Sequence, residues 1–456
     1  MFKRKIYEKL LNWKKTKIHH NTAILIEGAR RIGKSTLVEE FAKNEYDDYL
    51  WFDFSIESDE VKNEFEKNIS NLDTFYMNIF LLKNKSLKSR NSLIVFDEVQ
   101  LFPKARQAIK HLVKDDRFDN IETGSLIGIK ENVKGILLPS EEHIEKMYPM
   151  DFEEFLWATN DEITINIIKK AIAEKKALDD SIHRKVIEKF RTYMCVGGMP
   201  QAIDVFINEK NYSEVDKIKK DILVLYENDI QKKNSINNSK SSLIFKSLAS
   251  QIANYKSHFK YSIIKKSARA QHYIEAMDFL EESMIVNIAR NILEPELEIT
   301  TSIDYSDIKM FMGDTGLLIT KAINDNNEYG NDLYKRIIFD KDSANLGSIY
   351  ENVVAQILKS KNIDLFFNTY KYLDKNKKES KEKKYDIDFI LKNNKHIIPI
   401  EVKSSAFRNH KSLDNFYKKF NLKKDKRFVV YTKNYKIEDD IIYLPVYMLP
   451  FDFLNI

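Results

Sequence analysis

The chain has 456 residues, 43% of them hydrophobic and 31% charged, with a formal net charge of +5 at pH 7; this is ordinary for a soluble globular protein of about two to four domains. The single cysteine, Cys195, excludes an intrachain disulfide, and no apolar run approaches the roughly 18 residues that span a bilayer. We therefore expect a cytoplasmic protein with no membrane partner, whose small net charge permits a nucleic-acid partner without indicating one.

The predicted elements begin with an amphipathic helix within residues 1–20. Short apolar runs then predict buried strands at residues 23–26 and 93–96 and a further strand at 50–54, and residues 120–123 are the candidate for a fourth strand. Helical stretches separate the first three of these strands, and such alternation favours a parallel sheet with helices on both faces. Residues 151–250 are mostly helical in pattern, and from 347 to 456 a helix precedes alternating strand segments.

A phosphate-binding loop is predicted directly after the first strand. Residues 28–35, GARRIGKS, fit the pattern G-x-x-x-x-G-K-S/T, in which the two glycines permit close approach of the backbone to a phosphate. Lys34 is expected to reach the β- and γ-phosphates, and Ser35 to ligate Mg²⁺. The helix that follows adds the positive end of its dipole. We expect nucleotide contacts from Gly28, Ala29, Arg30, Arg31, Ile32, Gly33, Lys34, Ser35 and Thr36.

The third predicted strand ends in two acids, Asp97 and Glu98. Asp97 is expected to hold Mg²⁺ through water, and Glu98 to polarise the attacking water. The acids follow the loop by about 60 residues, which leaves room for a helix, a strand and another helix. Together the two motifs predict an enzyme that binds and hydrolyses ATP, with ATP and Mg²⁺ as cofactors.

The chain resembles the bacterial and archaeal AAA-type ATPases that carry a C-terminal domain of the DUF4143 class, which are relatives of the AAA+ and STAND ATPases. Five segments carry the resemblance: GARRIGKST, IVFDEVQ, IETGS, YPMDFEEF and CVGGMP. The resemblance covers nearly the whole chain. It implies an ATPase core, a winged-helix segment and a terminal domain of the restriction-endonuclease type.

The resemblance also implies further site residues. Thr123 and Ser125 end a strand where the family places a sensor that hydrogen-bonds the γ-phosphate or the water; the alternative is a plain glycine turn. Pro200 belongs to a G-x-P element that packs near the adenine in STAND-type ATPases; the alternative is a helix terminator. No arginine finger is assigned. Four arginines are available, for each of which a solvated surface is the simpler role: Arg30, Arg31, Arg106 and Arg117.

The middle of the chain has the order of a winged helix. Three helical segments lie within residues 243–290, a strand at 285–288 starts a wing, and 309–312 offers its return partner. Three side chains that could meet DNA lie near the start of the third segment, Arg269, Gln271 and His272. Acids on the same segment, Glu275, Asp278, Glu281 and Glu282, would repel phosphates, so a protein partner is the alternative.

Three acids and a lysine near the C-terminus follow the order of a metal-dependent nuclease core. Glu351 lies in a predicted helix, Asp388 starts an apolar strand, and Glu401 and Lys403 share one face of the next strand. Asp388 and Glu401 would hold Mg²⁺ against a phosphodiester, and Lys403 would orient the water. The arrangement matches PD-(D/E)xK nucleases, with Glu351 as the helical acid.

Two alternatives to this nuclease hypothesis stay open. In one, the fold is nuclease-like but inactive, and the acids form salt bridges. In the other, Asp386 rather than Asp388 faces the site, since positions two apart share a strand face. The resemblance favours Asp388.

These observations predict an α/β chain with a P-loop NTPase sheet of AAA+/STAND type, a helical lid, a winged helix and a PD-(D/E)xK-like α/β domain. The expected boundaries are 1–160 for the ATPase core, 161–235 for the lid, 236–335 for the winged helix and 336–456 for the terminal domain. The leading hypothesis is an ATPase whose nucleotide state controls a C-terminal module that binds DNA and carries a metal-dependent, nuclease-like site. The alternative is a signalling or scaffold ATPase whose C-terminal domain is an inactive platform; a protein partner or homo-oligomer is compatible with both.

Overall fold

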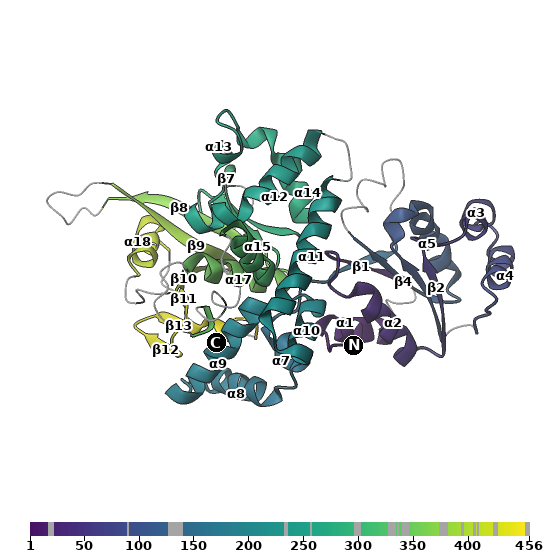
Figure 1. Ribbon diagram of the computed structural model, residues 1–456, viewed down its shortest axis with the longest axis horizontal. Helices are drawn as coiled ribbons and strands as arrows, with labels where there is room; N and C mark the ends of the chain where they lie inside the picture. The colour runs from purple at the N-terminus through teal and green to yellow at the C-terminus, as the bar shows by residue number, and fades with distance from the viewer. Residues whose placement is uncertain are drawn as a thin grey trace. The chain divides into compact units, whose positions relative to one another are not determined.

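The structure is a computed structural model of the chain. It describes residues 1–16, 22–88, 91–125, 140–231, 236–255, 258–295, 302–326, 334, 337–339, 346–373, 382–393, 396–404, 407, 410–422 and 427–451. The chain divides into two compact units (Figure 1). The first comprises Met1–Tyr148 with Glu282–Met284, and the second comprises Pro149–Glu281 with Ile285–Ile456.

The first unit contains a five-stranded sheet in the order β2-β3-β4-β1-β5, and every pair of neighbours is parallel. Its strands are β1 (Ala23–Glu27), β2 (Asp48–Asp53), β3 (Ser92–Asp97), β4 (Asp119–Gly124) and β5 (Glu142–Lys146). The predicted parallel sheet and its first four strands are thus confirmed. The sequence did not single out β5, an edge strand whose sequence EHIEK contains one apolar residue, Ile144.

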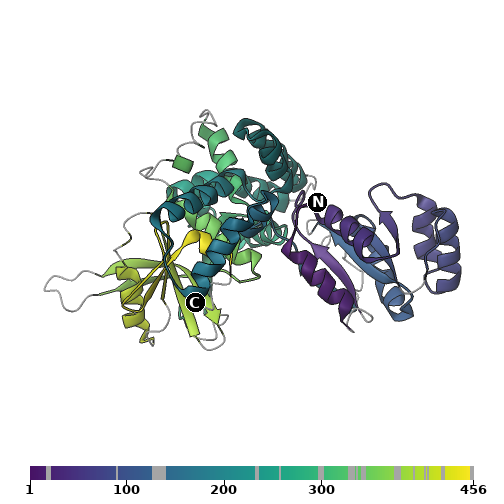
Figure 2. The ribbon, with the colours of Figure 1, turned by 90° about the horizontal axis from the view of Figure 1, so that it is seen from below.

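Helices cover this sheet on both faces (Figure 2). They are α1 (Lys5–Lys15), α2 (Lys34–Glu45), α3 (Asp59–Lys67), α4 (Leu72–Leu82) and α5 (Pro103–Asp115). The core includes apolar side chains of α3, α4 and α5 packed with alternate residues of the strands, such as Phe52 and Phe96. Local signals set the helix starts, because the side chains of Ser58 and Asn71 cap α3 and α4 and a proline begins α5.

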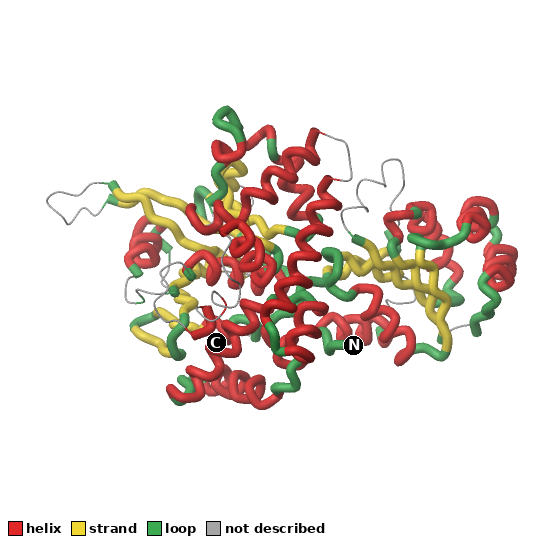
Figure 3. Tube along the Cα trace, in the orientation of Figure 1, coloured by secondary structure: helices red, strands yellow, loops and turns green. Residues whose placement is uncertain are grey.

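The second unit combines a helical part with a second sheet (Figure 3). Its helices are α7 (Phe152–Ala158), α8 (Glu162–Glu174), α9 (Asp180–Val196), α10 (Pro200–Glu209), α11 (Tyr212–Gln231), α12 (Ile236–Tyr255), α13 (Tyr261–Ile264), α14 (Ile274–Glu282), α15 (Thr315–Asn326), α17 (Gly347–Ser360) and α18 (Lys411–Phe420). Across the described ranges, no helix is both long enough and apolar enough to cross a membrane.

The second sheet has eight strands in the order β12-β13-β11-β10-β9-β8-β6-β7. They are β6 (Val286–Ile292), β7 (Ile303–Met312), β8 (Phe366–Tyr372), β9 (Lys383–Asn393), β10 (His396–Lys403), β11 (Arg427–Tyr431), β12 (Lys436–Glu438) and β13 (Ile441–Pro445). Parallel and antiparallel pairs both occur, so the C-terminal α/β domain is built on a mixed sheet.

The two strands expected to form a wing pair antiparallel, with Val286 opposite Met312. They do not stand apart as a hairpin, because β6 also pairs with β8 in parallel. The eight-stranded sheet therefore runs across the boundary that we expected near residue 335. Sequence periodicity predicts each strand but not its neighbours, and this pairing joins segments more than 70 residues apart.

Candidate functional site

The phosphate-binding loop lies between β1 and α2, and its geometry explains both of its glycines. A Cβ atom added to Gly28 would lie 2.5 Å from the carbonyl oxygen of Met147, so no side chain fits there. Gly33 precedes α2 with φ of 90°, in the left-handed region that favours glycine. The contact with Met147 therefore excludes a side chain at position 28, and the left-handed backbone favours glycine at position 33.

The side chain of Lys34 is buried against the loop. Its Nζ donates hydrogen bonds to the carbonyl oxygens of Gly28, at 3.1 Å, and Ala29, at 2.9 Å. Burial lowers the pKa of Lys34 to about 8, and the nearby carboxylates of Glu98 and Asp97 oppose this shift. The predicted lysine and the two predicted acids thus lie close enough in space to interact.

Two hydroxyl groups converge on Asp97 at the end of β3. Ser35 Oγ donates to Asp97 Oδ1 at 2.9 Å, and Thr123 at the end of β4 donates to the same oxygen. Burial raises the pKa of Asp97, while these two hydrogen bonds lower it. The carboxyl ends of adjacent parallel strands lie at one edge of the sheet, which is why residues 26 positions apart meet here.

Glu98 is held by a residue that the sequence analysis did not assign a role. Its backbone is left-handed, with φ of 54°, and the side-chain amide of Gln100 donates to its carboxylate. The same amide nitrogen lies 3.4 Å from Ser125 Oγ. Gln100 therefore links the predicted catalytic base to a predicted sensor. Its signal in the sequence was its place at the end of the segment IVFDEVQ, two residues after Glu98.

The structure corrects the expectation of a solvated surface for Arg106. This side chain is 4% exposed and forms a two-pronged ion pair with Glu142 on β5. Arg117 is partly exposed and pairs with Asp115 and Asp73. A buried guanidinium already bound to a carboxylate is not available to reach a nucleotide in trans.

Pro200 lies in the second unit, at the first position of α10. The preceding Gly198 donates its backbone N–H to Asp314 Oδ2 at 2.6 Å and accepts a backbone hydrogen bond from Met150 at 2.7 Å. The glycines of CVGGMP thus have a packing role within this unit. The predicted adenine contact of Pro200 stays a prediction.

The structure brings the predicted acids and lysine of the C-terminal domain together. Glu351 lies on α17, Asp388 on β9, and Glu401 and Lys403 on β10. Lys403 Nζ forms an ion pair with Glu401 Oε2 at 2.7 Å. Burial lowers the pKa of Lys403, but the charges of Glu401, Asp388 and Glu351 outweigh it and raise the pKa overall.

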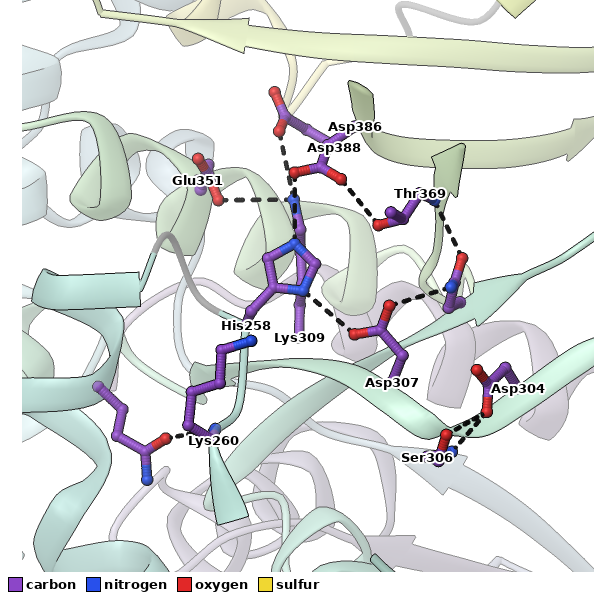
Figure 4. Close-up of polar contacts among 12 residues, drawn as sticks. His258, Lys260, Asp304, Ser306, Asp307, Lys309, Glu351, Thr369, Asp386 and Asp388 are labelled. Atoms are coloured by element: carbon purple, nitrogen blue, oxygen red, sulfur yellow. Dashed lines mark hydrogen bonds and ion pairs between the residues drawn. The ribbon is translucent and has the colours of Figure 1, made fainter. Parts of the chain in front are cut away.

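A second lysine, missed in the sequence, lies among these acids (Figure 4). Lys309 on β7 is buried, and its Nζ is 3.3 Å from Asp388 Oδ1 and 3.9 Å from Glu351 Oε2. The signal was a lysine within an otherwise apolar strand end, Lys309 to Met312. Fully buried lysines are rare unless they are paired with an acid. Because the partner of Lys309, Asp388, lies 79 residues away in the chain, the local sequence does not reveal the pair.

Asp386 makes different contacts from Asp388 (Figure 4). It accepts a hydrogen bond from Thr369 Oγ1 at 2.7 Å and lies 3.5 Å from His258 Nε2. Burial raises the pKa of Asp386, but these contacts and the charge of Lys309 outweigh burial and hold the pKa well below its usual range. Within the described part of the chain, no group of three or more His, Cys, Asp or Glu side chains is arranged to hold a metal ion.

Comparison with known families places these two sites in separate domains. Residues 20–156 match the AAA_14 family, an AAA domain, and residues 346–449 match DUF4143, a domain of unknown function. The chain carries an AAA domain and a DUF4143 domain. Between them, residues 187–328 match a further domain of unknown function, DUF8612. The predicted phosphate loop, strand-end acids and sensor lie in the AAA domain, and the predicted nuclease residues lie in the DUF4143 domain.

Solved structures offer distant likenesses. AMPPCP-bound DnaA from Aquifex aeolicus is 13% identical with a TM-score of 0.26, over 60% of this chain and 86% of that chain. PCH-2 from C. elegans is 12% identical with a TM-score of 0.19, over 54% of this chain and 58% of that chain. Comparison with curated proteins gives no match.

Proposed function

We propose that the AAA domain binds ATP with Mg²⁺ and hydrolyses it, and that the nucleotide acts as a switch for the rest of the chain. The observation that carries this proposal is the convergence of Ser35 and Thr123 on Asp97, beside the buried Lys34. Each of these residue types, in this place, suits recognition of a triphosphate. The family match to an AAA domain supports the same assignment.

Binding would use groups that the loop already presents. Backbone N–H groups at the start of α2 and the dipole of that helix favour an anion there. Lys34 is placed to exchange its two carbonyl partners for phosphate oxygens. Because those partners are neutral and the phosphates are charged, this exchange favours the bound state.

The residues present fit a magnesium ion. Ser35 and Asp97 offer a hydroxyl and a carboxylate oxygen 2.9 Å apart, which are the oxygen ligands that Mg²⁺ prefers. When bound, the ion would neutralise charge on the phosphate oxygens. Asp97 and Ser35 would hold it, and Thr123 would keep the carboxylate of Asp97 in place.

Hydrolysis would use Glu98 to orient and polarise the attacking water. Gln100 holds the carboxylate of Glu98 and lies near Ser125, so these three side chains would respond together to the γ-phosphate. Thr123 and Ser125 would act as sensors, because both hydroxyls lie at the end of β4 where the strand approaches the loop.

For the DUF4143 domain, the geometry favours a binding platform over a metal-dependent nuclease. Glu401 is paired with Lys403 and Asp388 with Lys309, so the acids already form salt bridges. DNA remains our proposed ligand for the second unit. It is supported by exposed cations around α13 and the turn before α14: Lys265, Lys266 and Arg269.

Two experiments test these assignments. Titration of ATP and Mg²⁺ into the full chain should show saturable binding and turnover that are lost in Lys34→Ala. Incubation of the wild type with plasmid DNA and Mg²⁺ or Mn²⁺, with and without ATP, should leave the DNA intact. Cleavage that disappears in Asp388→Ala and Lys403→Ala would instead establish a nuclease.

A further inference from the structure

The ammonium group of Lys309 lies beside two of the predicted nuclease acids, Asp388 and Glu351, where a metal ion bound by these acids would lie. Its Nζ is 3.3 Å from Asp388 Oδ1 and 3.9 Å from Glu351 Oε2, and its side chain is only 2% exposed (Figure 4). The lysine comes from β7, the last strand in the sheet order, which β9, β8 and β6 separate from β10. It is thus held in the sheet of the second unit, on a strand from the segment that matches DUF8612, and is not a mobile surface residue.

The remaining oxygens of the two predicted metal ligands are also engaged. Asp388 Oδ2 accepts a hydrogen bond from the backbone N–H of Val402 at 2.8 Å. Glu401 accepts a hydrogen bond from the hydroxyl of Ser412 through one oxygen and pairs with Lys403 through the other, at 2.7 Å. Every carboxylate oxygen of Asp388 and Glu401 therefore has a partner within the chain.

We infer that Lys309 takes the place of the divalent cation in this nuclease-like site. The acids of the DUF4143 domain are then neutralised by a lysine from the segment that matches DUF8612, and the site works without a metal. A bound Mg²⁺ would have to lie beside a buried ammonium or displace it from its acids. Either change leaves a buried charge repelled or unpaired. The inference concerns the second unit alone and does not depend on the proposed ATPase activity.

The geometry places the positive charge of Lys309 between two carboxylates, those of Asp388 and Glu351. A phosphodiester would meet a site whose acids are already compensated, without the metal ion that nucleases of this type use to stabilise the leaving oxygen.

Removal of the ammonium should create the missing metal site. The test measures Mn²⁺ binding to the nucleotide-free full chain by electron paramagnetic resonance. A Ser35→Ala background eliminates the candidate site of the AAA domain. With Lys309 intact, we expect Asp388→Asn to leave the amount of bound Mn²⁺ unchanged. Lys309→Ala should gain one bound Mn²⁺, displaced by excess Mg²⁺ and lost again when Asp388→Asn is added.

A matched control is Lys219→Ala, which removes another buried lysine of the second unit. Lys219 Nζ donates to the carbonyl oxygen of Cys195 and to the hydroxyl of Tyr334, at 2.7 and 2.9 Å. We expect no gain of Mn²⁺ in this variant. If Lys309→Ala does not fold, Lys309→Met preserves the side-chain volume and removes only the charge.

Two results would overturn the inference. One is Mn²⁺ binding with Lys309 intact that is abolished by Asp388→Asn or Glu401→Gln. The other is a folded Lys309→Ala or Lys309→Met variant that gains no Mn²⁺. Neither outcome alters ATP binding by the chain with Ser35 restored, so a failure here is distinct from a failure of the proposed ATPase.

Discussion

The hydroxyl of Ser35 donates a 2.9 Å hydrogen bond to Asp97, which ties the helix after the phosphate loop to the end of β3. The two residues are 62 positions apart in the chain. Their contact shows that the phosphate loop and the acids after β3 lie at one site. A ligand that separates or bridges these groups would move the loop and the strand end relative to each other.

The first prediction concerns Lys34. Lys34→Ala removes the buried ammonium that faces Asp97 and Glu98, so ATP affinity should fall by at least about 100-fold, the scale of a lost charge-assisted contact to phosphate. Calorimetric titration measures this directly. Lys43→Ala is the matched control, because Lys43 is exposed on the same helix and pairs with Glu39. The affinity of this variant for ATP should equal that of the wild type.

The second prediction separates binding from chemistry. Glu98→Gln should bind ATP with unchanged affinity and lower turnover by about 100-fold or more, since the base is lost and the shape is kept. Gln100→Ala should lower turnover by a smaller factor, because Glu98 remains but loses the amide that holds it. Phosphate release at saturating ATP reports both effects. Unimpaired turnover in Glu98→Gln would remove that residue from the mechanism.

The third prediction concerns Glu122, a fully buried acid on β4. Burial raises its pKa, and the negative charge of Glu142 adds to the shift although Arg106 opposes it. An acid whose pKa is raised by folding stabilises the fold fully at pH values below its ordinary pKa of 4.5. This contribution is lost as the pH rises through the folded pKa, at up to about 1.4 kcal/mol per pH unit.

Glu122→Gln should therefore flatten the pH dependence of the first unit and make it more stable than the wild type at pH 8. Urea unfolding at several pH values tests this in a Trp157→Phe background, where fluorescence comes from Trp13 and Trp51 of that unit. Equal slopes of unfolding free energy against pH in both proteins would show that Glu122 is ionised in the fold.

The fourth prediction concerns the glycines of CVGGMP. A Cβ on Gly198 would lie 2.2 Å from the carbonyl oxygen of Met150 and 2.7 Å from its nitrogen, so backbone would have to move. Gly198→Ala should destabilise the second unit by about 3 kcal/mol or more. In contrast, a Cβ on Gly347 would lie 3.7 Å from Ser404 Oγ, an ordinary van der Waals contact. Gly347→Ala should change stability by less than about 1 kcal/mol, in the favourable direction. Thermal melting of both variants decides the matter.

The sequence predicted the AAA domain well because its signals are local. The loop, the acids after β3 and the hydroxyl after β4 each sit at a strand end, and parallel strands bring their ends together. The four residues of the predicted nuclease core also proved to be neighbours. Their order along one helix and two consecutive strands contained that information.

The contacts of Lys309, which change the interpretation of the C-terminal site, were not predictable from local sequence signals. Lys309 reaches Asp388 only because β6 pairs with β8, which places strands from the middle of the chain in the C-terminal sheet. Likewise Arg106 is buried only because β5 joins the sheet edge and presents Glu142. Both depend on strand pairing between distant segments, which hydrophobic periodicity does not specify.

Our proposal for the AAA domain rests on ATP being held at Lys34, Ser35 and Asp97. The decisive measurement is calorimetric titration of ATP with Mg²⁺ into the purified full chain. We expect saturable binding of one nucleotide per chain in the wild type and an affinity at least about 100-fold lower in Lys34→Ala. A wild-type chain that takes up no nucleotide, or a Lys34→Ala variant that binds it as tightly as the wild type, would refute the proposed site.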